Sequence, residues 1–217
     1  MISNIFFDLD GTLTDSKEGI IKCYYYALDK LDCPAPIELQ NGSFIGLPLR
    51  VMFKKFLHSD DEALIERAVA IYRERFSTAG LFENKVYHGI PAMLSTLYEN
   101  SHRLYVVTGK PKIYADRIIE HFQLAPYFND IYGSELGGHF DNKADLIEFI
   151  LNNRKLSSKE SVMIGDKQED IIAGKANRIK TIGVTYGYGS LQEILDATPD
   201  FICGSPPEIK STIMSII

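Results

Sequence analysis

The 217-residue sequence has few cysteines and no long apolar run. Its three cysteines, Cys23, Cys33 and Cys203, are odd in number and form no Cys-x-x-Cys pair, which argues against a disulfide framework or a zinc site. That scarcity fits a reducing, cytoplasmic setting. No stretch approaches the roughly 18 apolar residues that cross a bilayer. The amino terminus also lacks a basic segment followed by a long apolar core, so we expect no signal peptide and no membrane partner.

The sequence also has fewer basic than acidic residues, and its formal net charge is -6. This balance argues against nucleic-acid polymers or anionic membranes as the main partners. Any anionic ligand must then be met by a metal ion or by a few placed cations. With 45% hydrophobic residues, the chain can bury one substantial core and a smaller second lobe. The sequence leaves the oligomeric state open.

An apolar, β-prone stretch at residues 2–7 ends abruptly in Asp8-Leu9-Asp10-Gly11. This pattern predicts a buried parallel strand that runs into a site at its carboxyl end. Two carboxylates this close repel each other when both are ionised, so they need a bound cation, a proton on one of them, or both. One aspartate can then attack a substrate while the other moves protons. The alternative is a surface turn, which the apolar strand directly upstream disfavours.

Residues 16–85 contain helical patterns and no good strand. Apolar spacing predicts helices over 16–31, from about 48 to 57, and over 64–76, with Ser16 capping the first and a Ser59–Glu62 capping box before the third. From about residue 86 onward, strand-like and helix-like stretches alternate. Such alternation implies βαβ units around a parallel sheet, with residues 16–85 inserted between 1–15 and 86–217. The expected strands are 104–107, 130–132, 161–164, 181–184 and 201–203, and the expected helices are 91–100, 112–122, 143–151, 168–177 and a last one after 203.

Thr108-Gly109-Lys110 follows the expected strand at 104–107. A hydroxyl, a free backbone N–H and an amine at the end of a strand all suit a phosphate group. The alternative is an ordinary strand-to-helix loop in which Thr108 caps the next helix.

Asp166 and Asp170 follow the expected strand at 161–164. Carboxylate oxygens on a rigid sheet edge are typical of a magnesium site. The alternative, that these acids complement the dipole of the following helix, suits Asp170 but explains Asp166 poorly.

Lys143 opens an expected helix, where a positive charge is unfavourable for the helix dipole. A nearby anion would account for this placement, whereas the alternative is a solvated lysine. Lys110 competes with Lys143 for the role of binding a phosphate.

Together, four stretches resemble in order and spacing the four motifs of the haloacid dehalogenase superfamily of phosphotransferases. They are Asp8-Leu9-Asp10-Gly11-Thr12, Thr108-Gly109, Lys143, and Gly165-Asp166 with Asp170. The resemblance covers the whole chain and implies an α/β fold, a Rossmann-like parallel sheet flanked by helices. It also implies that residues 16–85 are an inserted α-helical cap. The overall look is similar to phosphoglycolate phosphatase-like and 5′-nucleotidase-like members, partly through residues 184–189.

The same resemblance implies roles for the two aspartates of the first motif. Asp8 would be the nucleophile that becomes an aspartyl-phosphate, and Asp10 would protonate the leaving alcohol and then deprotonate water. It further implies Mg²⁺ held by Asp8, the Asp10 carbonyl and Asp166, with support from Asp170.

Phosphate binding is implied for three further groups: the Thr108 hydroxyl, the Gly109 N–H and the Lys143 ammonium. Many relatives have a proline directly after this lysine, whereas Ala144 follows here. Arg50, in the inserted block, suits a substrate carboxylate or second phosphate, although it is equally explained as a surface arginine.

These features predict a Mg²⁺-dependent phosphomonoesterase for a small phosphorylated metabolite, phosphoglycolate phosphatase-like or alternatively a 5′-nucleotidase. Asp10 argues against dehalogenation, in which no alkoxide needs a proton. A phosphosugar mutase similar to β-phosphoglucomutase keeps the same motifs and stays an alternative. So does a noncatalytic phosphate-binding protein, although no catalytic position is missing.

Overall fold

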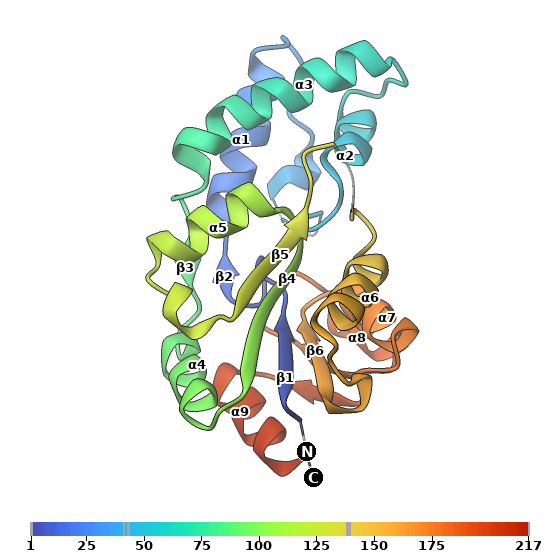
Figure 1. Ribbon diagram of the computed structural model, residues 1–217. Helices are drawn as coiled ribbons and strands as arrows, with labels where there is room; N and C mark the ends of the chain where they lie inside the picture. The colour runs from blue at the N-terminus through green and yellow to red at the C-terminus, as the bar shows by residue number, and fades with distance from the viewer. Residues whose placement is uncertain (1, 41, 43, 138–139, 217) are drawn as a thin grey trace. The chain divides into compact units, whose positions relative to one another are not determined.

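The computed structural model describes residues 2–40, 42, 44–137 and 140–216 (Figure 1). The chain forms two compact units. The first unit comprises residues 1–15 and 86–217, and the second comprises residues 16–85. The first strand therefore belongs to the same unit as the later part of the chain.

Six parallel strands form the main sheet of the first unit. They are β1 (Asn4–Phe7), β4 (Arg103–Pro111), β5 (Asp130–Ser134), β6 (Ser161–Gly165), β7 (Lys180–Val184) and β8 (Phe201–Cys203). Their order across the sheet is β5-β4-β1-β6-β7-β8. Strand β1 lies between β4 and β6, and its last residue, Phe7, is in register with Val106 and Ile164 (Figure 1). The segments that follow these three strands therefore share one edge of the sheet.

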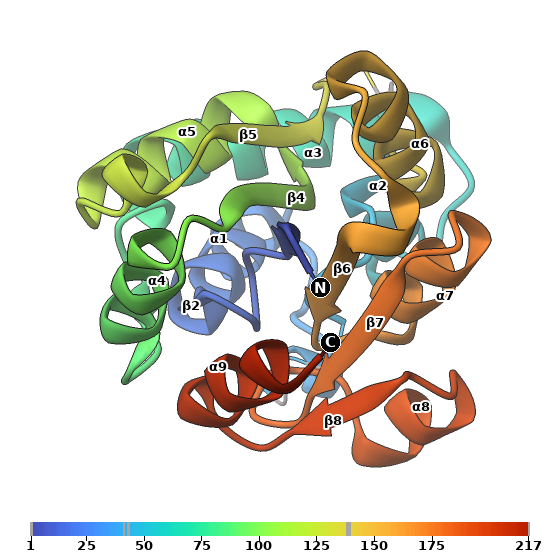
Figure 2. The same ribbon diagram turned by 60° about the horizontal axis from the view of Figure 1, so that its bottom comes forward.

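Helices cover both faces of this sheet. They are α4 (Ile90–Glu99), α5 (Lys112–His121), α6 (Lys143–Arg154), α7 (Gln168–Ala176), α8 (Leu191–Asp196) and α9 (Pro206–Ser215), with short 3₁₀ turns at Ala125–Tyr127 and Ser158–Glu160. Figure 2 shows α4 and α9 on one face and α6 and α7 on the other. On the second face, Leu146 and Ile147 of α6 pack with Phe6, Tyr105 and Met163 of the sheet. Because both faces are covered, the inner parts of β1, β4 and β6 are mostly apolar, and all four residues of β1 are buried.

The predicted α/β fold with a parallel sheet is confirmed, and two details differ. Strand β4 continues through Thr108 to Pro111, beyond the predicted end at Val107. Its pairing with β5 is irregular between Thr108 and Pro111, so polar residues continue the strand where apolar alternation has stopped. Helix α8 was not predicted, since six residues are too few to display helical periodicity.

A second sheet has only two short strands, β2 (Thr14–Asp15) and β3 (Lys85–Val86). They lie where the chain passes from one unit to the other. Next to them, the Tyr87 N–H donates to the Leu13 carbonyl at 3.1 Å.

The second unit is helical. It consists of α1 (Lys17–Asp29), a 3₁₀ turn at Ile37–Gln40, α2 (Leu49–Phe56), α3 (Glu62–Arg75) and a π-helical turn at Phe76–Gly80. Tyr24 lies at the centre of its core, with ring contacts at 4.9–5.3 Å to the partners Phe44, Phe53, Phe56 and Tyr72. The three predicted helices of this block are confirmed.

The two helix caps predicted for this unit do not form the expected hydrogen bonds. Ser16 stands at the N-cap position of α1, but its hydroxyl makes no capping hydrogen bond. The capping box predicted from Ser59 to Glu62 is also wrong, because Asp61 is the cap of α3. The Asp61 carboxylate accepts from the N–H groups of Ala63 and Leu64. Several capping residues follow one another here, and their backbone angles, not their types, decide which one caps.

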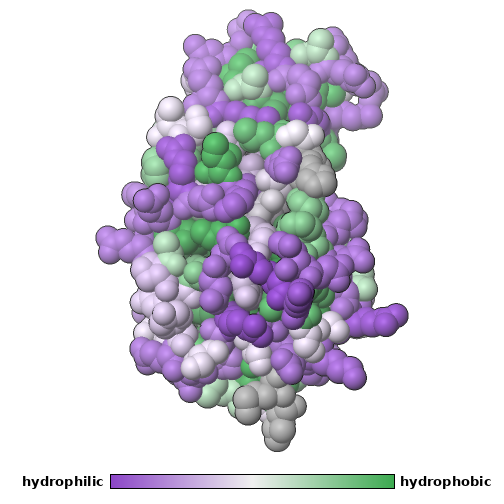
Figure 3. Space-filling view, viewed as in Figure 1, coloured by the Kyte–Doolittle hydropathy of each residue, from purple (hydrophilic) through white to green (hydrophobic). Residues whose placement is uncertain are grey.

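Within the described ranges, every helix is too short or too polar to reach across a lipid bilayer. Figure 3 shows a face on which hydrophilic side chains surround separate hydrophobic patches.

Candidate active site

Three neighbouring strands deliver polar residues to one edge of the sheet. Asp8 comes directly after β1, Thr108 lies in the last part of β4, and Asp166 comes directly after β6. The register of β1 with both neighbours places these residues close together, as expected at the carboxyl end of a parallel sheet. All three are buried.

Asp8, Asp166 and Asp170 form an acidic cluster at this edge. One carboxylate oxygen from each lies within 4.8 Å of the others. Asp170 reaches the cluster from the first turn of α7, and its second oxygen accepts from the Lys167 N–H at 3.1 Å. It therefore also satisfies the start of this helix, so the helix-dipole interpretation describes only part of what Asp170 does.

Lys143 contributes a positive charge to the acidic cluster. It is the first residue of α6, and its Nζ lies 3.0 Å from Asp8 Oδ1 and forms a second ion pair with Asp170. Only 12% of the side chain is exposed, so the interpretation of Lys143 as a solvated lysine is wrong. The unfavourable position at a helix start is compensated by two carboxylates.

Lys110 lies with the other aspartate of the first motif. Its Nζ is 2.7 Å from Asp10 Oδ2, and its N–H donates to the Thr108 hydroxyl at 3.2 Å. Helix α5 begins only at Lys112, after Pro111, so the interpretation of Thr108 as a helix cap is wrong. At Gly109 the carbonyl accepts from the Ser134 hydroxyl at 2.8 Å, and no heavy atom of the described residues lies within 4 Å of where a side chain would begin.

Known proteins share this arrangement of chain segments. A family model described as haloacid dehalogenase-like hydrolase matches residues 5–184. The chain belongs to this family. The matched residues include all four of the stretches whose order and spacing resemble the family motifs.

Relatives of this hydrolase include phosphatases with similar length. A 5′-nucleotidase of Pseudomonas aeruginosa is 40% identical over 212 residues, which cover 98% of this chain and 96% of that protein. A phosphoglycolate phosphatase of Vibrio parahaemolyticus is 26% identical, with coverage of 98% and 96%. The crystal structure of a predicted phosphatase from Clostridium acetobutylicum has a TM-score of 0.92 and 40% identity over 100% of both chains. The hydrolase is accordingly an enzyme of the phosphatase class.

A loop that was not predicted to contact the site surrounds Asp166 in this hydrolase. The Tyr188 N–H donates to Asp166 Oδ2 at 2.7 Å, and the Thr12 hydroxyl donates to Asp166 Oδ1 at 3.2 Å. A side chain at Gly187 would begin 2.3 Å from Asp166 Cβ, and one at Gly11 would begin 2.2 Å from Asp166 Oδ2. Gly11 also has φ +86°, which favours glycine. Gly11 and Gly187 were the only sign of this contact in the sequence, because a backbone N–H such as that of Tyr188 is present in almost every residue type.

Burial and charge shift the ionisation of the acidic cluster. Burial raises the pKa of Asp166 to about 6, and the Asp8 carboxylate adds to the rise. Burial also raises the pKa of Asp170, and the Lys143 ammonium opposes that rise. Burial alone would lower the pKa of Lys143, but the charges of Asp170 and Asp8 outweigh it and raise that pKa. Burial is thus the main cause of the raised pKa values of Asp166 and Asp170, and the neighbouring charges modify them.

Arg50 belongs to the second unit of the hydrolase. It lies in α2 and forms a two-pronged ion pair with Glu66 of α3, in which Nη2 is 3.0 Å from Oε2. Its side chain is 45% exposed. This pairing accounts for Arg50 within its own unit, and its contact with substrate stays a prediction.

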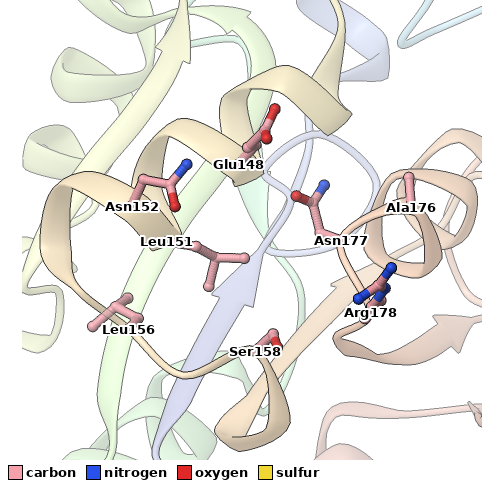
Figure 4. A pocket seen from close by; sticks show the side chains of 8 residues that line it. All are labelled: Glu148, Leu151, Asn152, Leu156, Ser158, Ala176, Asn177 and Arg178. Atoms are coloured by element: carbon pink, nitrogen blue, oxygen red, sulfur yellow. The ribbon is translucent and has the colours of Figure 1, made fainter.

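A cavity of about 350 Å³ lies beside the later part of α6 and the end of α7 (Figure 4). It is lined by the later part of α6, including Leu151 and Asn152, and by Asn177 and Arg178 after α7. The cluster instead uses the first turns of these two helices, through Lys143 and Asp170. None of the predicted site residues lines the cavity.

Proposed function

We propose that this hydrolase is a Mg²⁺-dependent phosphomonoesterase that acts on a small phosphorylated metabolite through an aspartyl-phosphate on Asp8. The observation that carries the proposal is the position of Asp8 at the end of β1, against Asp166, Asp170 and Lys143. An aspartate that attacks phosphorus must approach a dianionic ester, and this requires nearby positive charge. Lys143 supplies part of it.

The residues present fit a divalent cation of the hard, oxygen-binding type. Four carboxylates lie at this edge, including Asp10, and the ammonium groups in ion-pair contact with them are those of Lys110 and Lys143. In addition, Asp8 Oδ1 is buried, and its contact with Lys143 Nζ, at 3.0 Å, is an ion pair. Buried carboxylate oxygens in this state suit Mg²⁺, which binds through a few carboxylates and keeps its other positions for water and phosphate.

Asp8, the Asp10 carbonyl and Asp166 would hold the ion, with Asp170 in support. When bound, Mg²⁺ supplies charge that offsets the repulsion between the Asp8 carboxylate and the substrate phosphate.

Asp8 and the side chains around it have separate roles in nucleophilic attack, proton transfer and phosphate binding. Asp8 attacks phosphorus, and Asp10 donates a proton to the leaving alkoxide and then accepts one from the water that hydrolyses the intermediate. Lys110, at 2.7 Å from Asp10, holds this carboxylate in place. We assign phosphate binding to Lys143 because it contacts the nucleophile itself, and to the Thr108 hydroxyl and the Gly109 N–H, which lie on the neighbouring strand.

We further propose that residues 16–85 are a cap that contributes to substrate specificity. Their separate aromatic core supports a unit that keeps its own shape. Arg50 is the proposed contact for an anionic substrate group, for which it would exchange its pairing with Glu66.

Among small phosphate esters, nucleoside 5′-monophosphates are the first class to test. The relative named 5′-nucleotidase is 40% identical to this chain, whereas the relatives named phosphoglycolate phosphatase are 26–28% identical. Phosphoglycolate is therefore the second class. A comparison of kcat/KM across nucleoside monophosphates, phosphoglycolate and sugar phosphates separates them.

The setting proposed for this activity is the cytoplasm. No disulfide joins any of the three cysteines, all of which lie in the described residues, and the net charge of -6 matches a small-molecule substrate better than a nucleic-acid polymer or a membrane surface.

Replacement of Asp8 tests the mechanism. We expect Asp8→Asn to abolish release of phosphate from p-nitrophenyl phosphate in the presence of Mg²⁺, because an amide does not displace the ester. Asp116→Asn is the matched control, since Asp116 is a half-exposed aspartate of α5 that pairs with Lys112. Circular dichroism checks that both variants fold. Undiminished turnover by a folded Asp8→Asn variant would rule out the proposed nucleophile.

A further inference from the structure

The loop at residues 186–189, which follows β7, contacts both the acidic cluster and the segments that lead to the second unit. Its backbone donates from the Tyr188 N–H to Asp166 Oδ2 at 2.7 Å. Two side chains of the loop also donate hydrogen bonds. The Tyr188 hydroxyl donates to Asp15 Oδ1 at 2.8 Å, and the Tyr186 hydroxyl donates to the Thr12 carbonyl at 2.9 Å.

These bonds close a ring around Asp166. Thr12 donates its hydroxyl to Asp166 Oδ1 at 3.2 Å, so both carboxylate oxygens of Asp166 receive a bond from a residue that the loop holds or contains. The loop backbone lies directly against Asp166, because a side chain at Gly189 would begin 1.9 Å from the Asp166 carbonyl. The loop therefore contacts Asp166 through both its backbone and its carboxylate.

Asp15 is the last residue of the first unit before the chain enters residues 16–85, and Val86 is the first after it returns. The loop contacts both places. Tyr188 bonds to Asp15, and the ring of Tyr186 packs edge-on against Tyr87, with centroids 4.9 Å apart. The side chains of Tyr87 and Tyr188 also form a hydrogen bond with each other. The same four-residue loop thus fixes the two crossing segments and one carboxylate of the cluster.

We propose that Tyr188 is a positioning residue for the Mg²⁺ site, acting through its bond to Asp15. The phenol anchors the loop on the first crossing segment, and the anchored backbone N–H holds Asp166 Oδ2 so that the carboxylate faces Asp8 and Asp170. Tyr188 itself touches neither substrate nor the reacting atoms in this role. The inference rests on the proposed Mg²⁺ site and adds the residue that orients one of its ligands.

The test measures Mg²⁺ affinity in the full-length protein by isothermal titration calorimetry, together with the Mg²⁺ concentration that half-saturates turnover. Tyr188→Phe removes the hydroxyl and keeps the ring. We expect it to weaken Mg²⁺ binding by about three- to tenfold, the size of effect typical of one lost hydrogen bond. At saturating Mg²⁺, the KM for substrate should stay near that of the unchanged protein. Tyr98→Phe is the control, since Tyr98 of α4 is 53% exposed and belongs to no part of this ring.

Variants of Asp15 separate positioning from general destabilisation. Asp15→Ala should also weaken Mg²⁺ binding, and the double variant should bind Mg²⁺ no more weakly than Tyr188→Phe alone. Asp15→Asn keeps an oxygen that accepts from the phenol, so it should retain Mg²⁺ affinity. Thermal unfolding without Mg²⁺ checks that all variants fold.

Unchanged Mg²⁺ affinity in Tyr188→Phe, or additive losses in the double variant, would overturn the positioning role and leave the phosphatase proposal intact. Failure of the unchanged protein to bind Mg²⁺ at all would overturn both.

Discussion

Asp166 combines complete burial with two hydrogen bonds and a like-charged neighbour. Its raised pKa of about 6 means that the folded protein binds this proton more tightly than the unfolded chain, whose aspartates ionise near 4. Between these two values, the unfolded chain holds fewer protons, so stability falls as the pH rises and stays lower above pH 6. Without a metal, the ionised carboxylate is thus a local cost to the fold.

Asp166→Asn should therefore raise the free energy of unfolding of the metal-free protein at pH 7.5, by about 2 to 3 kcal/mol and by roughly half of that at pH 5. The geometry accepts the amide, because its oxygen can accept from the Tyr188 N–H while its nitrogen donates to the Thr12 hydroxyl. Urea unfolding in EDTA measures the change. The same variant should lose the stabilisation that Mg²⁺ confers on the unchanged protein.

Glu169→Gln is the control for this prediction, since Glu169 is an exposed acid in the same first turn of α7. Its effect should stay within about 0.5 kcal/mol. An Asp166→Asn variant that is less stable than the unchanged protein at pH 7.5 would contradict the account of the cluster's charge.

The acidic cluster itself could be predicted from single residues, and its supporting contacts could not. Asp8 and Asp166 each follow a buried strand, and this position alone brings carboxylates to a common sheet edge. By contrast, Tyr188 reaches Asp166 through a backbone N–H, which any residue type other than proline offers. The separate pairings of Lys143 and Lys110 also depend on side-chain directions that sequence spacing does not determine.

At the scale of the elements, long periodic helices and apolar strands were predictable, and their ends were not. Strand β4 extends past its apolar residues because Thr108 and Pro111 still pair with β5. The start of α3 was predicted from residue types alone, and Ser59, Asp60 and Asp61 are all types that cap helices. The structure selects Asp61 through its extended backbone and its two accepted hydrogen bonds.

The cap of α3 gives a prediction at this scale. Asp61→Ala should lower the free energy of unfolding by about 1 kcal/mol, because two N–H groups of the first turn lose their acceptor. Glu62→Ala should cost less, since Glu62 makes no part of the cap. Chemical denaturation of the two variants side by side measures the difference. A larger loss from Glu62→Ala would restore the capping box that the structure rejects.

At the scale of the whole molecule, the first strand and its two aspartates are joined to a sheet built almost entirely from residues after 103. The switch from helical to alternating patterns near residue 86 was visible in the sequence, and so was the parallel sheet. The packing inside the second unit was not, because the rings around Tyr24 come from three separate segments. Long-range contacts of this kind leave no local pattern.

The central claim for the whole enzyme is that a phosphoryl group passes through Asp8. The most direct measurement is to quench the protein with acid during turnover of a phosphate ester with Mg²⁺, reduce it with borohydride, and locate modified residues by peptide mass spectrometry. An aspartyl-phosphate is reduced to homoserine, whereas a free aspartate is not. We predict homoserine at position 8 alone, dependent on substrate and missing from Asp8→Asn. Modification at another aspartate, or none at position 8 during active turnover, would contradict the mechanism.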